Sequence, residues 1–263
     1  MKLTVLPAST GARWVREGLR TFWRQPMALS GLFGLFMLTV TLIGQIPYVG
    51  LVLAMTLLPA ATLGFMAATH EATQARFPLP AILLAALRAG QQQRRSMLAL
   101  GLGYAAGFLG AMGVSALVDG GTFAQLYLGH GGGTPHEAML DTQFQLALLT
   151  FLSLHLPLSL AFWHAPALVH WQQMPVLKSL FFSLVVCVRN FGAYTVFGVG
   201  WFLVVSLVVL GLSMIGLALG NPGLVVQMLY PALLLLTAMF FTSLYFTYRD
   251  SFGAPSGAVS SVA

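Results

Sequence analysis

Three histidines in the fourth apolar segment are the residues whose type could support chemistry within a membrane. His155, His164 and His170 lie close to Pro157 and Pro166. An ionisable side chain in such a segment is costly to bury, so it is a functional candidate by default. His155 and His164 are nine residues apart, which places them on opposite faces of a helix, and neither has a histidine or carboxylate one turn away. This spacing argues against a metal site.

Three interpretations of these histidines stay open. In the first, the prolines free backbone carbonyls that neighbouring groups satisfy, and the histidines form hydrogen bonds within the bundle or at its interface. In the second, His155, His164 and His170 serve transport or a proton relay. In the third they are catalytic. The first interpretation is favoured, because no partner residue for the other two lies at a suitable spacing.

Other chemistry-bearing residues are few. The segment 129–137 contains His130, His136 and Glu137, but its glycines and proline favour a mobile loop over a metal site. The single cysteine, Cys187, excludes an intramolecular disulfide and a thiolate cluster. No Gly-x-Ser-x-Gly elbow, HExxH motif or close carboxylate pair occurs, so the sequence predicts no enzyme, no cofactor and no metal.

The composition shows what must position these residues. Hydrophobic residues make up 58% of the chain and charged residues only 7%. A soluble protein carries about a quarter charged residues, so a water-facing surface cannot be built from this composition. Apolar runs recur along the whole length, which predicts a single integral membrane domain over residues 1–263.

Six segments are long enough to span a bilayer and lack Lys, Arg, Asp and Glu. Their continuous apolar character predicts helices, since barrel strands would be about ten residues long with alternating polarity. The fold class is therefore all-α, a polytopic transmembrane bundle. The predicted spans are 27–46, 48–70, 97–117, 146–169, 195–217 and 224–246, with a cytoplasmic tail at 249–263.

The positive charges predict the orientation of these spans. Lys and Arg are retained on the cytoplasmic side during insertion. With six spans, both termini are cytoplasmic and the only charges on the opposite side are Asp119, Glu137 and Asp141. The first eleven residues have no apolar core, so a cleaved signal peptide is not expected. All twelve basic residues fall on the cytoplasmic side: Lys2, Arg13, Arg16, Arg20, Arg24, Arg76, Arg88, Arg94, Arg95, Lys178, Arg189 and Arg249.

An amphipathic helix is predicted over residues 12–25, before the first span. Its basic stripe lies opposite an apolar face, with two indoles at the margins. This pattern is typical of a helix in the headgroup plane, with its apolar face in the lipid and its arginines toward anionic headgroups. The stripe consists of Arg13, Arg16, Glu17, Arg20 and Arg24, the apolar face of Val15, Gly18, Leu19 and Phe22, and the indoles of Trp14 and Trp23.

A similar unit appears twice more along the chain. Segment 80–92 leads to Arg94 and Arg95 before the third span, and segment 175–188, with Lys178 and Arg189 on one stripe, precedes the fifth. The pattern predicts three copies of an interfacial helix followed by a membrane hairpin. These basic residues are expected at the membrane surface. Nucleic acid is not an expected partner, because topology accounts for the arginines.

Three stretches resemble an uncharacterised family of proteobacterial inner-membrane proteins with six helices. They are 164–171 (HAPALVHW), 178–190 (KSLFFSLVVCVRN) and 240–250 (FFTSLYFTYRD). The likeness covers nearly the whole chain and implies a location in the bacterial inner membrane. The stretches are also distantly similar to the membrane domain attached to some glycerophosphodiester phosphodiesterases. That activity belongs to a soluble domain that has no counterpart here, so none is transferred.

The sequence therefore favours a non-enzymatic structural, assembly or envelope role, with the lipid bilayer and a membrane protein as partners. A small-molecule or lipid transporter or channel is the alternative. That alternative requires a polar cavity lined by residues from several spans, whereas the favoured role predicts that the same residues point into packed protein. A lipid-modifying enzyme would need a histidine in a headgroup-sized pocket with a carboxylate. The residues that discriminate are Gln45, Thr56, Thr62, His155, His164 and Thr242.

Overall fold

The computed structural model describes residues 4–47, 49–129 and 135–253, and these residues form helices and connecting turns without a strand. Continuous apolar runs take this form because each backbone amide in a helix is satisfied within its own segment. The elements are α1 (Thr10–Arg24), α2 (Pro26–Gly44), α3 (Gly50–Thr73), η1 (Pro80–Leu84), α4 (Ala85–Arg88), α5 (Gln91–Asp119), α6 (Thr122–Tyr127), α7 (Pro135–Leu140), α8 (Thr142–Phe162), α9 (Ala165–Trp171), α10 (Val176–Arg189), α11 (Phe191–Ala218) and α12 (Pro222–Phe252).

Six helical stretches of the described chain are long and apolar enough to cross a membrane, which confirms the predicted fold class. Each predicted span overlaps one of them. The first predicted span runs two residues past the end of α2. Helices α5 and α12, which contain the third and sixth predicted spans, extend well beyond the predicted bounds. The stretches are Pro26–Gly44, Gly50–Thr73, Gln91–Asp119, Thr142–Trp171, Phe191–Ala218 and Gly223–Phe252.

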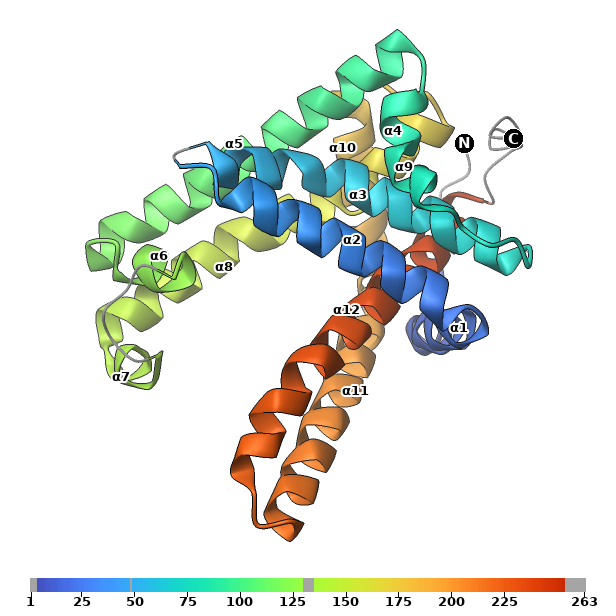
Figure 1. The fold of residues 1–263 in the computed structure, drawn as a ribbon. Helices are drawn as coiled ribbons and strands as arrows, with labels where there is room; N and C mark the ends of the chain where they lie inside the picture. The colour runs from blue at the N-terminus through green and yellow to red at the C-terminus, as the bar shows by residue number, and fades with distance from the viewer. Residues whose placement is uncertain (1–3, 48, 130–134, 254–263) are drawn as a thin grey trace.

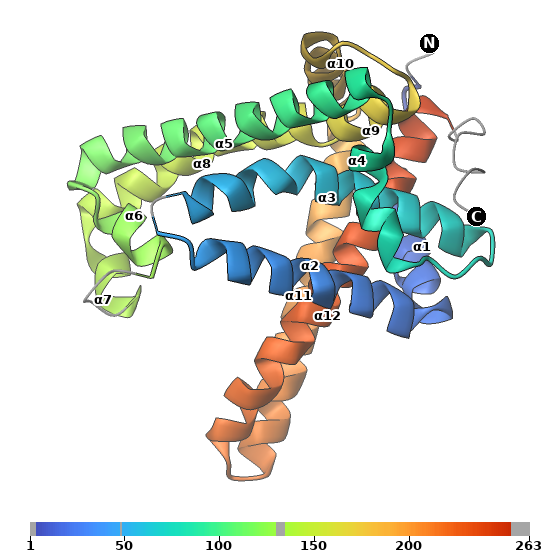
Figure 2. The same cartoon turned by 45° about the horizontal axis from the view of Figure 1, so that its top comes forward.

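The spans pair into three hairpins, α2–α3, α5–α8 and α11–α12 (Figure 1). The α11–α12 hairpin projects away from the other two in both views (Figure 2). Far from the hairpin bases, α5 and α8 form a cluster of their own with α6, in which Phe108, Phe123, Phe144 and Phe151 are buried together. Met55 of α3 also packs against this cluster, so the first two hairpins contact each other along part of their length, and all three meet at one end of the molecule.

The arginine-bearing segments meet at this shared end, called the basic end below. Hydrogen bonds between distant parts of the chain join these segments. Arg13 of α1 donates to Asp250 of α12, and Gln25 donates to the carbonyl of Arg76. Gln93 of α5 donates to the carbonyl of His170 in α9. The first helix and the last described turn thus lie side by side, as an even number of spans requires.

The inner half of α12, residues 236–251, forms the centre of the packing at the basic end. Every residue from Thr242 to Tyr248 is buried, as are Leu236, Ala238, Met239 and Ser251. A helix that is buried all round belongs in a protein core. We call residues 236–251 with the side chains around them the hub. It includes Trp14, Phe22, Leu63 and Phe197.

The outer part of the same hairpin is the opposite case. In residues 202–218 of α11 and 222–235 of α12, Gly216 is the only one classed as buried among those whose burial is described, and the few partly buried against the hub include Val204, Val208 and Leu234. We call these residues the arm. Of its apolar side chains, Phe202, Leu207 and Val226 are more than 60% exposed.

Helix α1 lies against α11 and α12, and this position differs from the predicted one. Its apolar residues Val15, Gly18 and Phe22 are buried by protein rather than by lipid. Trp14, predicted at the membrane surface, is fully buried, so that prediction is wrong for this residue. Hydropathy cannot distinguish the two environments, because lipid tails are as apolar as leucine side chains. Glycine permits the close approach, since a Cβ on Gly18 would lie 2.5 Å from the Cβ of Ser243.

A helical segment precedes each hairpin, namely α1, η1 with α4, and α10. The segments differ in length, with 15 residues in α1, nine in η1 and α4 together, and 14 in α10. Because a repeat requires equivalent packing as well as equivalent order, the threefold repeat stays a prediction.

Candidate functional site

The fourth span is broken at Trp163 and His164, immediately before α9. Pro166 lacks an amide hydrogen and its ring clashes with a carbonyl one turn earlier, which favours a break here, although α3, α8 and α12 continue through Pro59, Pro157 and Pro231. The hydroxyl of Ser183 on α10 replaces the missing bond between residues 160 and 164. It accepts a hydrogen bond from the amide of His164 at 2.9 Å and donates one to the carbonyl of Leu160 at 2.8 Å. Ser183 therefore satisfies one amide and one carbonyl of the backbone at this break.

The side chain of His164 is fully buried at this break. Its Nε2 shares a hydrogen bond of 2.5 Å with the hydroxyl of Tyr194 at the start of α11. Its ring packs against Phe252 and Tyr248, with ring centroids 5.3 and 6.1 Å away. Nδ1 has no hydrogen-bond partner among the described residues. His164 thus joins the broken span to α11 and α12 from within packed protein.

The other two histidines lie in different surroundings. His155 stacks on Phe151 at 5.0 Å within the α5–α8 cluster. His170 lies on α9, where its carbonyl accepts the hydrogen bond from Gln93. No hydrogen bond or ring contact in the described structure joins any two of His155, His164 and His170. The structure therefore does not bring the three candidate residues into one site.

An ion-pair network ties α1 to the end of α12. Arg13 lies 2.9 Å from Asp250, and Arg249 lies 2.8 Å from Glu17. Asp250 also accepts a hydrogen bond of 3.0 Å from the indole of Trp14. These partly exposed pairs are individually weak, but a shared acceptor makes them a network. Asp250 could not be found from the sequence, because it lies 236 residues from Trp14 and no local pattern indicates its role.

Three arginines of α1 have no such partner. Arg16, Arg20 and Arg24 are exposed at intervals of one helical turn, and no ion pair of the described residues includes them. Like charges at this spacing repel each other, so an external negative charge would stabilise the stripe. Trp23 beside them is 65% exposed. Their place on the solvent- or lipid-facing side is compatible with the predicted membrane surface.

The remaining predicted surface residues are also exposed. Arg94 and Arg95 lie in the first turn of α5, while Lys178 and Arg189 lie near the two ends of α10. The ammonium of Lys178 lies 5.9 Å from the centre of the Phe182 ring. All four belong to α5 or α10, which meet at the basic end.

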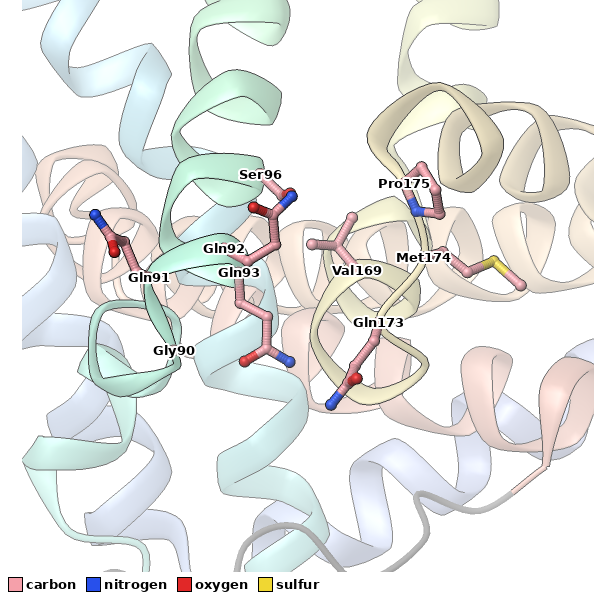
Figure 3. Close-up of a pocket in the computed structure, with 9 residues that line it drawn as sticks. All are labelled: Gly90, Gln91, Gln92, Gln93, Ser96, Val169, Gln173, Met174 and Pro175. Carbon is pink, nitrogen blue, oxygen red and sulfur yellow. The ribbon is translucent and has the colours of Figure 1, made fainter.

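A pocket of about 400 Å³ opens at the basic end between the start of α5 and the α9–α10 loop (Figure 3). Val169, Met174 and Pro175 form its apolar part. The lining contains no histidine and no carboxylate, so it lacks the groups that a lipid-modifying enzyme would need. Its remaining lining residues are Gly90, Gln91, Gln92, Gln93, Ser96 and Gln173.

Neither thiol nor metal chemistry is favoured by the described residues. Cys187 on α10 is buried, and burial raises the pKa of its thiol to about 12. A thiol with so high a pKa is almost entirely protonated at neutral pH and is a poor nucleophile. No group of three potential metal ligands occurs in the described part of the chain. His130 and the side chain of His136 lie outside the described residues.

Comparison with known proteins supplies one relative. The chain is 36% identical, over 255 residues, to a probable inner membrane protein of Burkholderia thailandensis; the match covers 96% of this chain and 94% of the relative. No protein-family profile and no solved structure matches it. The relative's name and the six apolar helices identify a multi-pass protein of the inner membrane. Neither bears on the distant likeness to the phosphodiesterase-associated membrane domain, which stays a prediction.

Proposed function

This chain belongs to the family of the Burkholderia thailandensis inner membrane protein, and we propose that it acts without catalysis as a structural or assembly component of that membrane. In this role both termini and the whole basic end lie in the cytoplasm, as the distribution of lysine and arginine predicts. The arginine stripe of α1 rests on anionic headgroups, each arginine contributing about 1 kcal/mol.

The arm is the observation that carries this proposal. Helices associate in a membrane through close packing, since lipid and leucine are equally apolar. Most outer residues of α11 and α12 are exposed, and those packed against the hub are the ones nearest to it, such as Val204 and Leu234, while the same two helices are surrounded by protein at the hub. A span of a partner membrane protein laid along Phe202 or Leu207 would add the packing that the arm lacks.

The intramembrane polar residues support a role in packing over transport. Thr56, Thr62 and Thr242 each donate a hydrogen bond to the carbonyl one turn earlier in their own helix. His164 is sealed by aromatic rings, and His155 belongs to a separate cluster. A transporter or channel needs such residues around one cavity. Their separation therefore favours the structural role over the transporter or channel.

Site-specific photocrosslinking in cells tests the arm. We expect a benzophenone amino acid at Phe202 to give a discrete protein adduct, because that side chain is 69% exposed on the arm. The matched control is Leu152 on α8, which is 49% exposed outside the arm. A discrete adduct at position 202 but not at 152 supports the proposal. Lipid adducts alone at both positions would contradict it.

A further inference from the structure

We propose that the pocket at the basic end binds the phosphate-bearing headgroup of an anionic phospholipid. The site lies apart from the α1 stripe, and it extends the proposed role by assigning a discrete lipid site. Its volume of about 400 Å³ falls within the range of small-molecule sites in proteins. Its two walls are the start of α5 and the loop after α9, which are the two ends of the α5–α8 hairpin, so a bound lipid would also brace the base of that hairpin.

The polar side chains of the pocket are available to a ligand. Gln92 and Ser96 lie one turn apart on the same face of α5, and Figure 3 shows both directed toward the wall that bears Pro175. Neither side chain has a hydrogen-bond partner among the described residues, and the same holds for Gln173 on the opposite wall. Amide and hydroxyl hydrogens are the donors that a phosphate oxygen accepts from.

The charge around the pocket favours an anion. Arg95 follows Gln92 by three residues on α5, so the two side chains are neighbours on the helix surface. Lys178 begins α10 three residues after Pro175, beyond the other wall. Both basic side chains are exposed and neither forms an ion pair in the described structure. The lining contains no acid, so these nearby basic side chains would favour an anionic ligand.

The position of the pocket favours a lipid over a wholly polar ligand. Ser96 immediately precedes the apolar run of the third span, so the pocket lies at the depth where headgroups meet acyl chains. Val169 and Met174 give the pocket an apolar part beside its amides. An amphipathic molecule whose phosphate meets the amides and whose carbon chain leaves along α5 fits both features.

Native mass spectrometry of the whole protein with phosphatidylglycerol tests the site. We expect the double variant Gln92→Ala with Ser96→Ala to bind this lipid about tenfold more weakly, equivalent to about 1.4 kcal/mol. Gln173→Gly, which keeps the left-handed backbone at φ 53°, is expected to weaken binding from the other wall. Gln227→Ala, an exposed glutamine on the arm, is the control. Unchanged affinity in both pocket variants, with their melting temperatures intact, would overturn the proposal.

Two further measurements distinguish a lipid headgroup from free phosphate, and binding in the pocket from binding at the α1 stripe. If millimolar inorganic phosphate displaces the lipid, the site takes soluble phosphate esters and the lipid assignment is overturned; if it does not, the lipid assignment stands. Phosphatidylcholine should bind more weakly, since its headgroup has no net negative charge. The triple variant Arg16→Gln, Arg20→Gln and Arg24→Gln removes the α1 stripe. If this variant loses the tightly bound lipid and the pocket variants keep it, the pocket is not the lipid site. The proposed contact of the α1 stripe with headgroups would still stand.

Discussion

The two ends of the α11–α12 hairpin have opposite surroundings. At the hub, α12 is enclosed by α1, α2, α3 and α11, and its threonines, serines and tyrosines are buried. In the arm, the same two helices present leucine, valine and phenylalanine to their surroundings. The difference shows that hydrophobicity places both halves in the membrane, while only contacts from distant segments turn one half into a core.

The largest expected effect comes from matched phenylalanines on α11. Phe197 is 2% exposed and packs on Trp14, Trp163 and Phe240, whereas Phe202 is 69% exposed. We expect Phe197→Ala to lower the free energy of unfolding by about 3–5 kcal/mol, because it leaves a cavity. Phe202→Ala should change it by less than about 0.5 kcal/mol. Thermal unfolding in a mild detergent measures both, and equal losses would erase the distinction between hub and arm.

Two glycines test the contact of α1 with the hub. An added Cβ on Gly18 would lie 2.5 Å from Ser243, while one on Gly34 of α2 meets nothing within 4 Å. We expect Gly18→Ala to cost about 1–3 kcal/mol through overpacking. Gly34→Ala should be neutral or slightly stabilising, since alanine favours a helix. Denaturant titration of the two variants gives the comparison, and a stable Gly18→Ala protein would place α1 off the hub.

A smaller effect is expected from Asp250, which joins α1 to α12. Asp250→Asn removes the negative charge beside Arg13 and Arg249. These arginines are 31–45% exposed, so solvent screening limits the loss to about 1 kcal/mol. A double-mutant cycle with Arg13→Gln should give a coupling energy above zero. Additive single effects would mean that the pair does not hold the two helices together.

The smallest expected effect is seen in the labelling of Cys187, a measurement that leaves the packing of the hub unchanged. The Cys187 thiol is buried, and its pKa of about 12 keeps the thiolate scarce at neutral pH. We therefore expect a water-soluble maleimide to leave it unlabelled in the folded protein and to label it after unfolding. Arg189→Cys, in an exposed position two residues away, should react without unfolding. Rapid labelling of Cys187 in the native protein would show that α10 opens readily.

Only part of the candidate site could be predicted from the sequence. Pro166 indicates a helix break and a need for replacement hydrogen bonds. Its sequence surroundings do not identify Ser183 and Tyr194 as the partners, because they lie on later helices, 19 and 30 residues from His164. The glutamines at 91–93 are visible in the sequence, but their pocket exists only because the loop at Gln173 faces them.

The sequence by itself determined which segments are long and apolar enough to span the membrane. Transfer of a residue into a bilayer depends on that residue and its near neighbours, so the six spans and the shared side of the basic residues could be read from composition and order. Tertiary structure decided which apolar faces meet protein and which face outward. Trp14 and Trp23 belong to one amphipathic helix, yet one is enclosed and the other exposed. Lipid and protein interiors are equally apolar, so only the packing of distant helices separates them.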